Sequence, residues 1–420
     1  MNFEQFVTEI LTDLKNNNNH ALTLLNQNKE LIQKNLGTDA NIEVMDQFVC
    51  DLTNVVIQNT KNKFNIIENV LKHSTMTNVY QHFKNSKVMI KSVQMENKHA
   101  FKWLKLIGVS PYVQDENGMN VLMHMVRKKL IFDSHIKTFA SDKICANQTD
   151  INGRTALFHA LNCSTSLWKL LECDININHQ DNEGNTALIY CCKIENYSSI
   201  NSLFRKNIDV NAVDHDGKTA AMYLAMKGKY STVDIIGGKA AIYENIKGRR
   251  SLFQTLQSLN CNFNYVNDRG ESVLSLLLKQ MYIPKFIREE MFDKYISTLV
   301  SLLFTNCDFN MPVDEDGNTA SMVFLLVNDM DTYNFVLKYR DDIDLTKKNK
   351  YDENAIIYFQ KYKEGKLNSN IIGKNTNYAD VNLTENVIQK EKYIYKALEK
   401  ELGISGKINR SFEYLFVVPS

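Results

Sequence analysis

The sequence predicts an all-α solenoid in which copies of one unit, a short β-hairpin finger followed by two helices, are stacked side by side. Three observations support this: a recurring glycine turn, apolar helical segments after each turn, and an alternating extended stretch before it. The turn glycines follow one another at steps of 35, 31, 33, 53 and 47 residues. A period near 33 residues is typical of repeats that bury their apolar faces only against neighbouring copies.

Each turn has an Asp or Asn three residues before its glycine, as in QDENGMNVLMHMV around the first copy. Such a turn requires a positive φ angle, which glycine adopts without a steric penalty. The turn glycines are Gly118, Gly153, Gly184, Gly217, Gly270 and Gly317. The polar residue two positions later is expected to cap the next helix by accepting a backbone N–H. These expected caps are Asn120, Thr155, Thr186, Thr219, Ser272 and Thr319.

Two short helices are expected after each turn, because apolar residues recur there at helical rather than alternating spacing. The second helices of the pairs are predicted at 166–172, 199–206, 251–259 and 297–304. Before the turns, residues 208–212 and 261–265 alternate apolar with polar side chains. An extended stretch that leads into a tight turn predicts a hairpin, here called a finger.

The turn, the first helix and the extended stretch together resemble the ankyrin-repeat family, whose pattern is D-x-x-G, then T-P-L-H-x-A, then G-A-D-V-N-A. The best matches are DHDGKTAAMYLA at 214–225, DINGRTALFHA at 150–160 and IDVNAVD at 208–214, and the resemblance covers residues 98 to 362. The chain departs from the pattern in lacking the proline, which is replaced by Ala156 in the second copy, so its helix starts are less pre-organised. The motif histidine is also replaced, for example by Phe158.

A seventh copy follows the last glycine turn. Residues 343–346 have the pattern of the extended stretch, and Asp352 takes the place of the glycine. Asp tolerates the left-handed region better than most residues, so the turn is expected to survive. The following helix, at 355–365, would end the array as a capping unit.

The remaining segments divide the chain into four parts. Residues 1–97 are predicted as a helical N-terminal domain, and 98–365 as the array of six or seven repeats. The long steps place insertions near 228–250 and 280–296, the second expected to be an added amphipathic helix. Residues 366–383 are predicted to be a linker, and 384–420 a C-terminal helix and tail.

Composition excludes several classes of function. The net charge of +1 provides no general attraction to nucleic acid or an anionic membrane, and no apolar run approaches the length of a membrane span. The eight cysteines are expected to be free and mostly buried, as small apolar side chains in a reducing compartment. The alternative interpretation is a metal site formed by His159, Cys163, Cys173, His179 and Cys191, but the chain lacks the C-x-x-C pair that structural zinc sites normally use. No cofactor, metal or catalytic motif is predicted.

The resemblance therefore implies a non-enzymatic, monomeric, cytoplasmic scaffold that binds a protein partner. Only nine of the 49 basic residues are arginines, which indicates an AT-rich genome. Degenerate ankyrin arrays of this kind occur in large DNA viruses, intracellular bacteria and protists, which suggests a viral or pathogen protein that engages a host protein in the host cytoplasm. Two alternatives stay open: an adaptor that recruits ubiquitin-ligase machinery through 384–420, and an enzyme in residues 1–97.

The predicted binding residues lie at the finger tips, which project freely and are not needed for stacking. Their charge balance is acidic, so we expect the partner to present Lys or Arg. The predicted tip residues are Glu116, Asn117, Ile151, Asn152, Asn182, Glu183, His215, Asp216, Asp268, Arg269, Glu315 and Asp316.

Overall fold

The computed structural model describes residues 1–59, 63–128, 131–227, 252–282, 289–364 and 367, with the side chains of 289–293 left out. The chain divides into two compact units, Met1–Ile208 and Asp209–Ser420, called unit 1 and unit 2 here. The described secondary structure is helical, and extended pairing among these residues is limited to one antiparallel bridge between Val213 and Thr219. The all-α prediction is confirmed.

Unit 1 begins with a helical region that has no finger. Its apolar stripes are the ones expected from the sequence, since Phe6, Ile10 and Leu14 are buried on the first helix. The helices of this region are α1 (Phe3–Asn16), α2 (His20–Gln27), α3 (Lys29–Leu36), α4 (Ile42–Gln58), α5 (Asn65–Leu71), the 3-10 turn η1 (Ser74–Met76), α6 (Thr77–Lys84), α7 (Val88–Gln94) and α8 (Lys98–Leu106). The predicted domain boundary at 97/98 falls between α7 and α8, which pack against each other.

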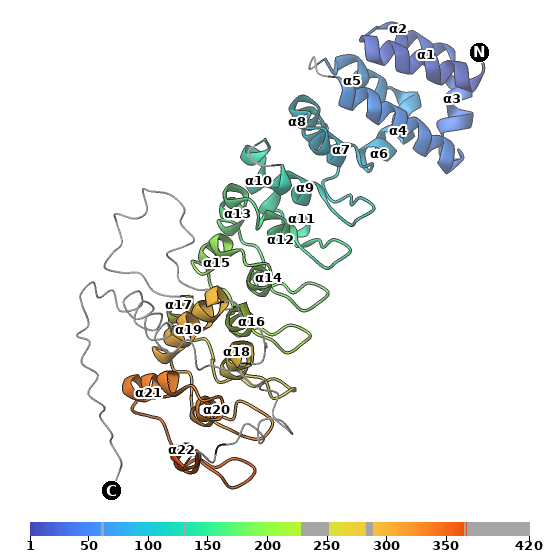
Figure 1. Cartoon of the computed structure of the whole chain (residues 1–420). Coiled ribbons are helices and arrows are strands. Elements are labelled where there is room, and N and C mark those ends of the chain that lie inside the picture. Colours follow the sequence, from blue (N-terminus) through green and yellow to red (C-terminus); the bar gives the residue numbers. More distant parts are fainter. Residues whose placement is uncertain (60–62, 129–130, 228–251, 283–288, 365–366, 368–420) are drawn as a thin grey trace, which may run out of the picture. The chain divides into compact units, whose positions relative to one another are not determined.

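Three finger-bearing repeats complete unit 1, and their fingers project to one side (Figure 1). In each repeat the first helix is nearly all buried, and the second packs on its outer side. The helices are α9 (Val121–Arg127), α10 (Asp133–Ala140), α11 (Lys143–Asn147), α12 (Ala156–Ala160), α13 (Ser164–Leu171), α14 (Ala187–Lys193) and α15 (Tyr197–Leu203). We number the fingers of Gly118, Gly153 and Gly184 as fingers 1, 2 and 3.

Unit 2 repeats the same plan. Its first helices pack on one another, α16 on α18 and α20 on α22, with the second helices alongside. The helices are α16 (Ala220–Lys227), α17 (Leu252–Ser258), α18 (Val273–Tyr282), α19 (Glu289–Leu303), α20 (Ala320–Leu326), α21 (Met330–Tyr339) and α22 (Ala355–Lys363). Its turns at Gly217, Gly270, Gly317 and Asp352 form fingers 4 to 7. The predicted seventh turn exists, since Asp352 has a φ of 64°.

Neighbouring fingers are joined by backbone hydrogen bonds. In unit 1 the Ile151 N–H donates to the Asn117 carbonyl at 3.0 Å, and the Asn182 N–H donates to the Asn152 carbonyl at 2.9 Å. In unit 2 the Lys350 N–H donates to the Asp316 carbonyl at 2.9 Å. We call these three bonds the rungs. They show that adjacent repeats are held in a fixed register at the fingers as well as through their helices.

A second link between repeats in unit 2 uses asparagine side chains at the base of the fingers. Asn264 Nδ2 donates to the Asn306 carbonyl at 3.1 Å, and its Oδ1 accepts the Asp308 N–H at 2.7 Å. Asn211 and Asn310 make the same pair of bonds to the repeat that follows each of them. One amide thus pairs with both a donor and an acceptor of the next repeat, which fixes the spacing between repeats.

Several sequence predictions need correction. Thr155 and Thr319 do not cap their helices, and their buried hydroxyls have no hydrogen-bond partner among the described residues. In α12 the Phe158 N–H instead donates to the Thr155 backbone carbonyl at 3.1 Å. Asn120, Thr186, Thr219 and Ser272 cap as predicted. The expected added helix near 280–296 is not separate, because α18 runs to Tyr282 and the later part belongs to α19. The insertion at 228–250 and residues 384–420 lie outside the described residues.

Replacing Gly153 with Ala should destabilise unit 1 much more than replacing Gly108. Both glycines have φ near +75°, so placing alanine in this left-handed conformation should lower the free energy of unfolding by about 1 kcal/mol in each variant. A Cβ on Gly153 would also lie 2.8 Å from the Asn182 backbone nitrogen, whereas nothing lies within 4 Å of one on Gly108. Because this Cβ would overlap the rung, the total loss of stability in Gly153→Ala should be about 3 kcal/mol.

Urea unfolding followed by tryptophan fluorescence measures this difference, because both tryptophans of the chain, Trp103 and Trp168, belong to unit 1. Equal losses in Gly153→Ala and Gly108→Ala would show that the fingers are not in close contact.

Candidate functional site

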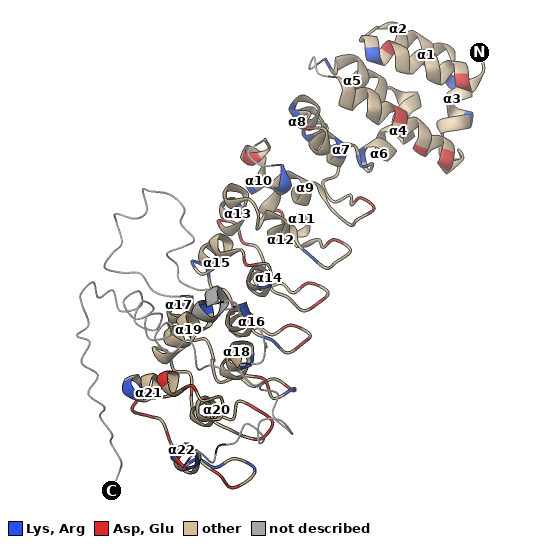
Figure 2. Ribbon diagram, in the orientation of Figure 1, with Lys and Arg blue, Asp and Glu red and all other residues tan. Residues whose placement is uncertain are grey.

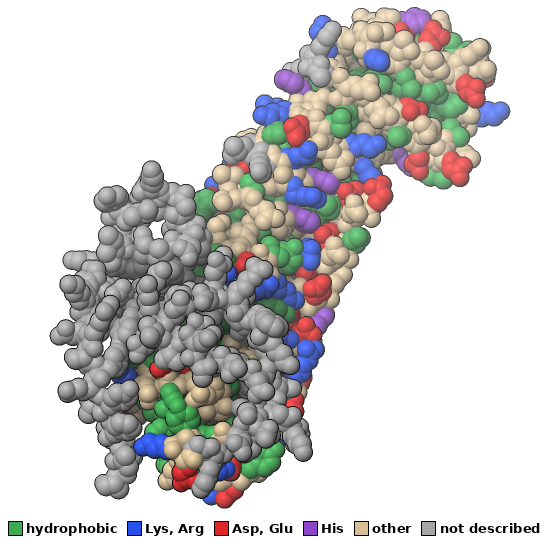
Figure 3. Space-filling view, in the orientation of Figure 1, with side chains coloured by type: hydrophobic (Ala, Val, Ile, Leu, Met, Phe, Trp, Pro, Cys, Tyr) green, Lys and Arg blue, Asp and Glu red, His purple; other side chains and the backbone are tan. Residues whose placement is uncertain are grey.

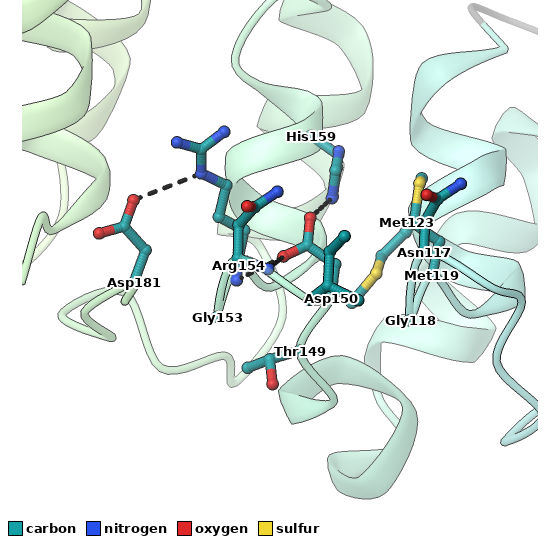
Figure 4. A network of polar contacts seen from close by, with 12 residues as sticks. Asn117, Gly118, Met119, Met123, Thr149, Asp150, Gly153, Arg154, His159 and Asp181 are labelled. Atoms are coloured by element: carbon teal, nitrogen blue, oxygen red, sulfur yellow. Dashed lines mark hydrogen bonds and ion pairs between the residues drawn. The ribbon is translucent and has the colours of Figure 1, made fainter. Parts of the chain in front are cut away.

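Each finger is organised by the side chain of the Asp or Asn that begins its turn. In finger 2, Asp150 Oδ1 accepts the N–H groups of Asn152 and Arg154, both at 2.9 Å, and the Gly153 N–H donates to the Asp150 carbonyl (Figure 4). The same side-chain bonds recur at Asp115, Asp181, Asp214, Asn267 and Asn349. One side chain therefore sets the shape of each finger.

The other end of this side chain ties the finger to the first helix, through the residue nine positions later. His124 Nε2 lies 2.7 Å from Asp115 Oδ2, and His159 Nε2 lies 3.0 Å from Asp150 Oδ2. In fingers 4 and 7 of unit 2 a tyrosine occupies the same position, for example Tyr223, whose hydroxyl donates to Asp214 at 2.6 Å. Fingers 5 and 6 have Leu276 and Val323 there and lack this bond. His124 and His159 therefore hold the fingers to their first helices by hydrogen bonds. Sequence reasoning missed the nine-residue spacing, although it is visible as D-x8-H and D-x8-Y.

Finger 3 departs from this pattern. The second oxygen of Asp181 lies 3.3 Å from Arg154 Nε and 3.1 Å from Asn185 Nδ2. Tyr190, nine residues after Asp181, makes no bond to it. The guanidinium of Arg154 instead stacks over the Tyr190 ring, 4.6 Å from the ring centre. Figure 4 shows the Arg154 side chain and its bond to Asp181. The side chain of one repeat thus reaches across to the next.

Burial and charge set the protonation of this region. Burial lowers the pKa of His159; the nearby Asp150 carboxylate raises it, and the positive charges of Arg127 and Arg154 lower it further, so the net pKa lies below the usual 6.5. The pKa of Asp115 is raised by burial but lowered more by the donors around it, chiefly the Met119 N–H and then His124, so it ends below its usual value. His159 is therefore neutral near pH 7.

The cysteines behave as the sequence predicts. All eight are free, and burial raises the pKa values of Cys145, Cys261 and Cys307 to about 12. Of the candidate metal ligands, His159 is bonded to Asp150, and His179 Nε2 lies 2.8 Å from the Gly153 carbonyl. Within the described residues, no group of three or more His, Cys, Asp or Glu side chains is arranged to hold a metal ion.

The predicted tip residues lie along the fingers, where the ribbon of Figure 2 is coloured for Asp and Glu in both units. Several of the acids are already engaged within the chain. Glu116 pairs with Lys87, Glu183 lies 3.7 Å from Lys193, and Asp216 lies 2.8 Å from Arg269. Asp316 accepts the Tyr351 hydroxyl at 3.0 Å.

Two tip acids remain available. Asp268 and Glu315 are both exposed and have no ion-pair or hydrogen-bond partner among the described residues. Ile151, at the tip of finger 2, is 63% exposed. Asp268, Glu315 and Asp316, all in unit 2, are therefore the tip acids without a cationic partner among the described residues.

These fingers and helix pairs define a helical-repeat protein built from ankyrin-type units. The family described as "Ankyrin repeats (3 copies)" matches residues 161–247. The match agrees with the sequence resemblance to ankyrin repeats over this part of the chain. Ankyrin repeats form a module for protein–protein interaction.

Among solved structures, the chain is similar to the ankyrin repeat domain of Bcl-3, described as a unique member of the IkappaB protein family. The two share 16% identity with a TM-score of 0.39, and the likeness covers 56% of this chain and 88% of that chain. No curated protein matches the sequence. None of the described helices combines the length and apolar character that crossing a bilayer requires.

Replacing His159 with Tyr, the residue found at this position in fingers 4 and 7, should make unit 1 less sensitive to acid. Because the folded pKa of His159 lies below 6.5, the unfolded chain binds the proton first as the pH falls. The stability contributed by neutral His159 is thus complete above pH 6.5 and is lost as the pH falls through the folded pKa. Tyr retains a donor for Asp150 and does not titrate there.

Urea unfolding at pH 7 and pH 5, followed by tryptophan fluorescence, should show a smaller acid-induced loss in the variant. Some loss will remain, because burial also lowers the pKa of His135 in the same unit. An unchanged difference between the two pH values would contradict the account of His159.

Proposed function

We propose that this chain is a non-enzymatic scaffold that captures a protein partner along its finger tips. The proposal is carried by one observation: each finger is shaped by the side chain that begins its turn, and three pairs of neighbouring fingers are also joined by the rungs, so the outermost tip side chains are not needed for folding. Side chains that are exposed, held on a rigid frame and free of internal partners are available for recognition.

The chemistry of the free tip residues favours a partner surface with lysine or arginine. Asp268 and Glu315 are unpaired acids on successive fingers of unit 2, and Glu183 and Asp216 keep their charges in weak, exposed pairs. Exposed pairs of this kind contribute little to stability, so a partner can compete for them. Electrostatic complementarity of this type accelerates association and selects among partners.

The cellular setting is proposed from composition. A lysine-rich, arginine-poor chain that carries degenerate repeats fits a protein of a large DNA virus, an intracellular bacterium or a protist, acting in the host cytoplasm on a host protein. We further propose that the chain acts as a monomer and that nucleic acids and membranes are not its partners.

Reversing the two free charges, in an Asp268→Lys and Glu315→Lys double variant, should reduce partner capture by about tenfold or more, since a like charge now faces the partner's basic surface. The full-length chain serves as bait in a lysate of its native host, and captured proteins are quantified by mass spectrometry. The matched control is Asp39→Lys with Glu43→Lys, the same charge change on exposed acids of the finger-free helical region.

The control should capture the partner as the unchanged chain does, and thermal unfolding should be nearly the same for all three proteins. Undiminished capture by the Asp268→Lys and Glu315→Lys variant would reject the tip surface.

A further inference from the structure

A second surface of unit 1 has the opposite charge chemistry to the tips. It consists of Arg127 at the end of α9, Arg154 and His159 in the second repeat, and Tyr190 on α14; we call these four residues the inner cluster. Figure 3 shows Lys, Arg and His side chains close together in the part of unit 1 that carries these repeats. The two guanidinium groups both lie close enough to His159 to act on its protonation.

The inner cluster has hydrogen-bond donors without acceptors. Arg154 uses Nε for Asp181, while its Nη1 and Nη2 have no partner among the described residues, and Figure 4 shows this end of the side chain pointing away from Asp181. Arg127 contacts only the sulfur of Met119, at 3.5 Å, and pairs with no described carboxylate. An arginine with an open donor edge is suited to bidentate binding of a carboxylate.

The departure of finger 3 from the common pattern leaves a further donor free. In fingers 1, 2 and 4 the residue nine positions after the turn acid is bonded to that acid. In finger 3, Arg154 and Asn185 take that place on Asp181, and the Tyr190 hydroxyl has no partner among the residues that the structure describes. The Tyr190 ring meanwhile supports the Arg154 guanidinium by stacking.

The acids beneath the cluster do not fill these donors. Asp150 and Asp181 are buried, with exposures of 9% and 5%. The carboxylate oxygens of Asp150 and Asp181 accept backbone N–H groups of their own turns. Asp150 is also bonded to His159 Nε2, and Asp181 accepts a hydrogen bond from Arg154 Nε. The cluster therefore retains donors with no carboxylate acceptor among the described residues: the guanidinium of Arg127, the Nη1 and Nη2 groups of Arg154 and the Tyr190 hydroxyl.

We propose that the inner cluster binds an aspartate or glutamate side chain of an acidic segment in a partner protein, with Arg154 as the principal donor and Tyr190 and Arg127 beside it. This inference rests on the proposed function of the array as a protein-binding scaffold and adds the chemistry of one contact. Arginine and tyrosine are the residue types that dominate binding energy at protein interfaces. Carboxylate is favoured over phosphate, because the buried Asp150 and Asp181 would repel a dianion more strongly than a single charge.

The test uses a fluorescein-labelled hexaglutamate peptide and the full-length chain, with binding followed by fluorescence anisotropy at low and moderate salt. Arg154→Ala should weaken binding about tenfold, equivalent to about 1.4 kcal/mol. Tyr190→Phe should weaken it by roughly threefold, since it removes one hydrogen bond and leaves the ring that packs near Phe158. The matched control is Arg205→Ala, an exposed arginine of the same unit that lies over Trp168.

Arg205→Ala should stay within about twofold of the unchanged chain, because removing one distant surface charge has little effect on a specific contact. Arg154→Ala also removes a hydrogen bond to Asp181, so tryptophan fluorescence is used to check that this variant is folded. If the variant is unfolded, the proposal is judged on the binding of the Tyr190→Phe variant instead. The absence of hexaglutamate binding, equal loss in Arg205→Ala, or hexauridylate RNA displacing the peptide at equal concentration would each overturn the proposal.

Failure here can be told apart from failure of the tip surface. The Asp268→Lys and Glu315→Lys variant should bind hexaglutamate as the unchanged chain does. If it does so but still captures its natural partner undiminished, the tip proposal fails and the inner cluster stands.

Discussion

The structure depends on one interaction that recurs in every finger: the side chain of an Asp or Asn that accepts backbone N–H groups of its own turn. In finger 2, Asp150 binds two such groups and also meets His159 on the first helix. Without these bonds the turn would expose several N–H groups, and the finger would not hold its edge toward the next repeat. With them, the finger is rigid enough for rungs such as the Ile151 bond to Asn117.

Much of this architecture could be predicted from the sequence, because the turn has strict requirements. Positive φ at Gly153 and at Asp352 follows from the turn type alone. The bond between His159 and Asp150 could not be predicted, since it depends on how the helix is placed over the finger. For the same reason the sequence did not reveal that the Thr155 side chain fails to cap α12. Nor did it reveal that Asp181 bonds to Arg154 and Asn185 instead of to Tyr190.

The net charge of the candidate surfaces likewise could not be predicted fully from the sequence. Counting acids along the tips predicts a negative surface, but charge counts do not say which acids are neutralised internally. Asp216 meets Arg269, whose position depends on the fold, whereas Asp268 beside it has no described partner. In unit 1, Arg154 and Asn185 replace Tyr190 on Asp181, which leaves the Tyr190 hydroxyl without an acceptor among the described residues. A partner that fits both surfaces would carry basic and acidic segments, and mixed charge of this kind gives selectivity.

Hydrogen–deuterium exchange of the rung amides tests most directly whether the fingers lock neighbouring repeats together. The backbone N–H groups of Ile151 and Asn182 should exchange as slowly as those in the buried turns of α9 and α14, because they are bonded across repeats and open only when the repeats separate. Exchange of these two amides at the rate of an exposed loop, while the helices stay protected, would contradict the account.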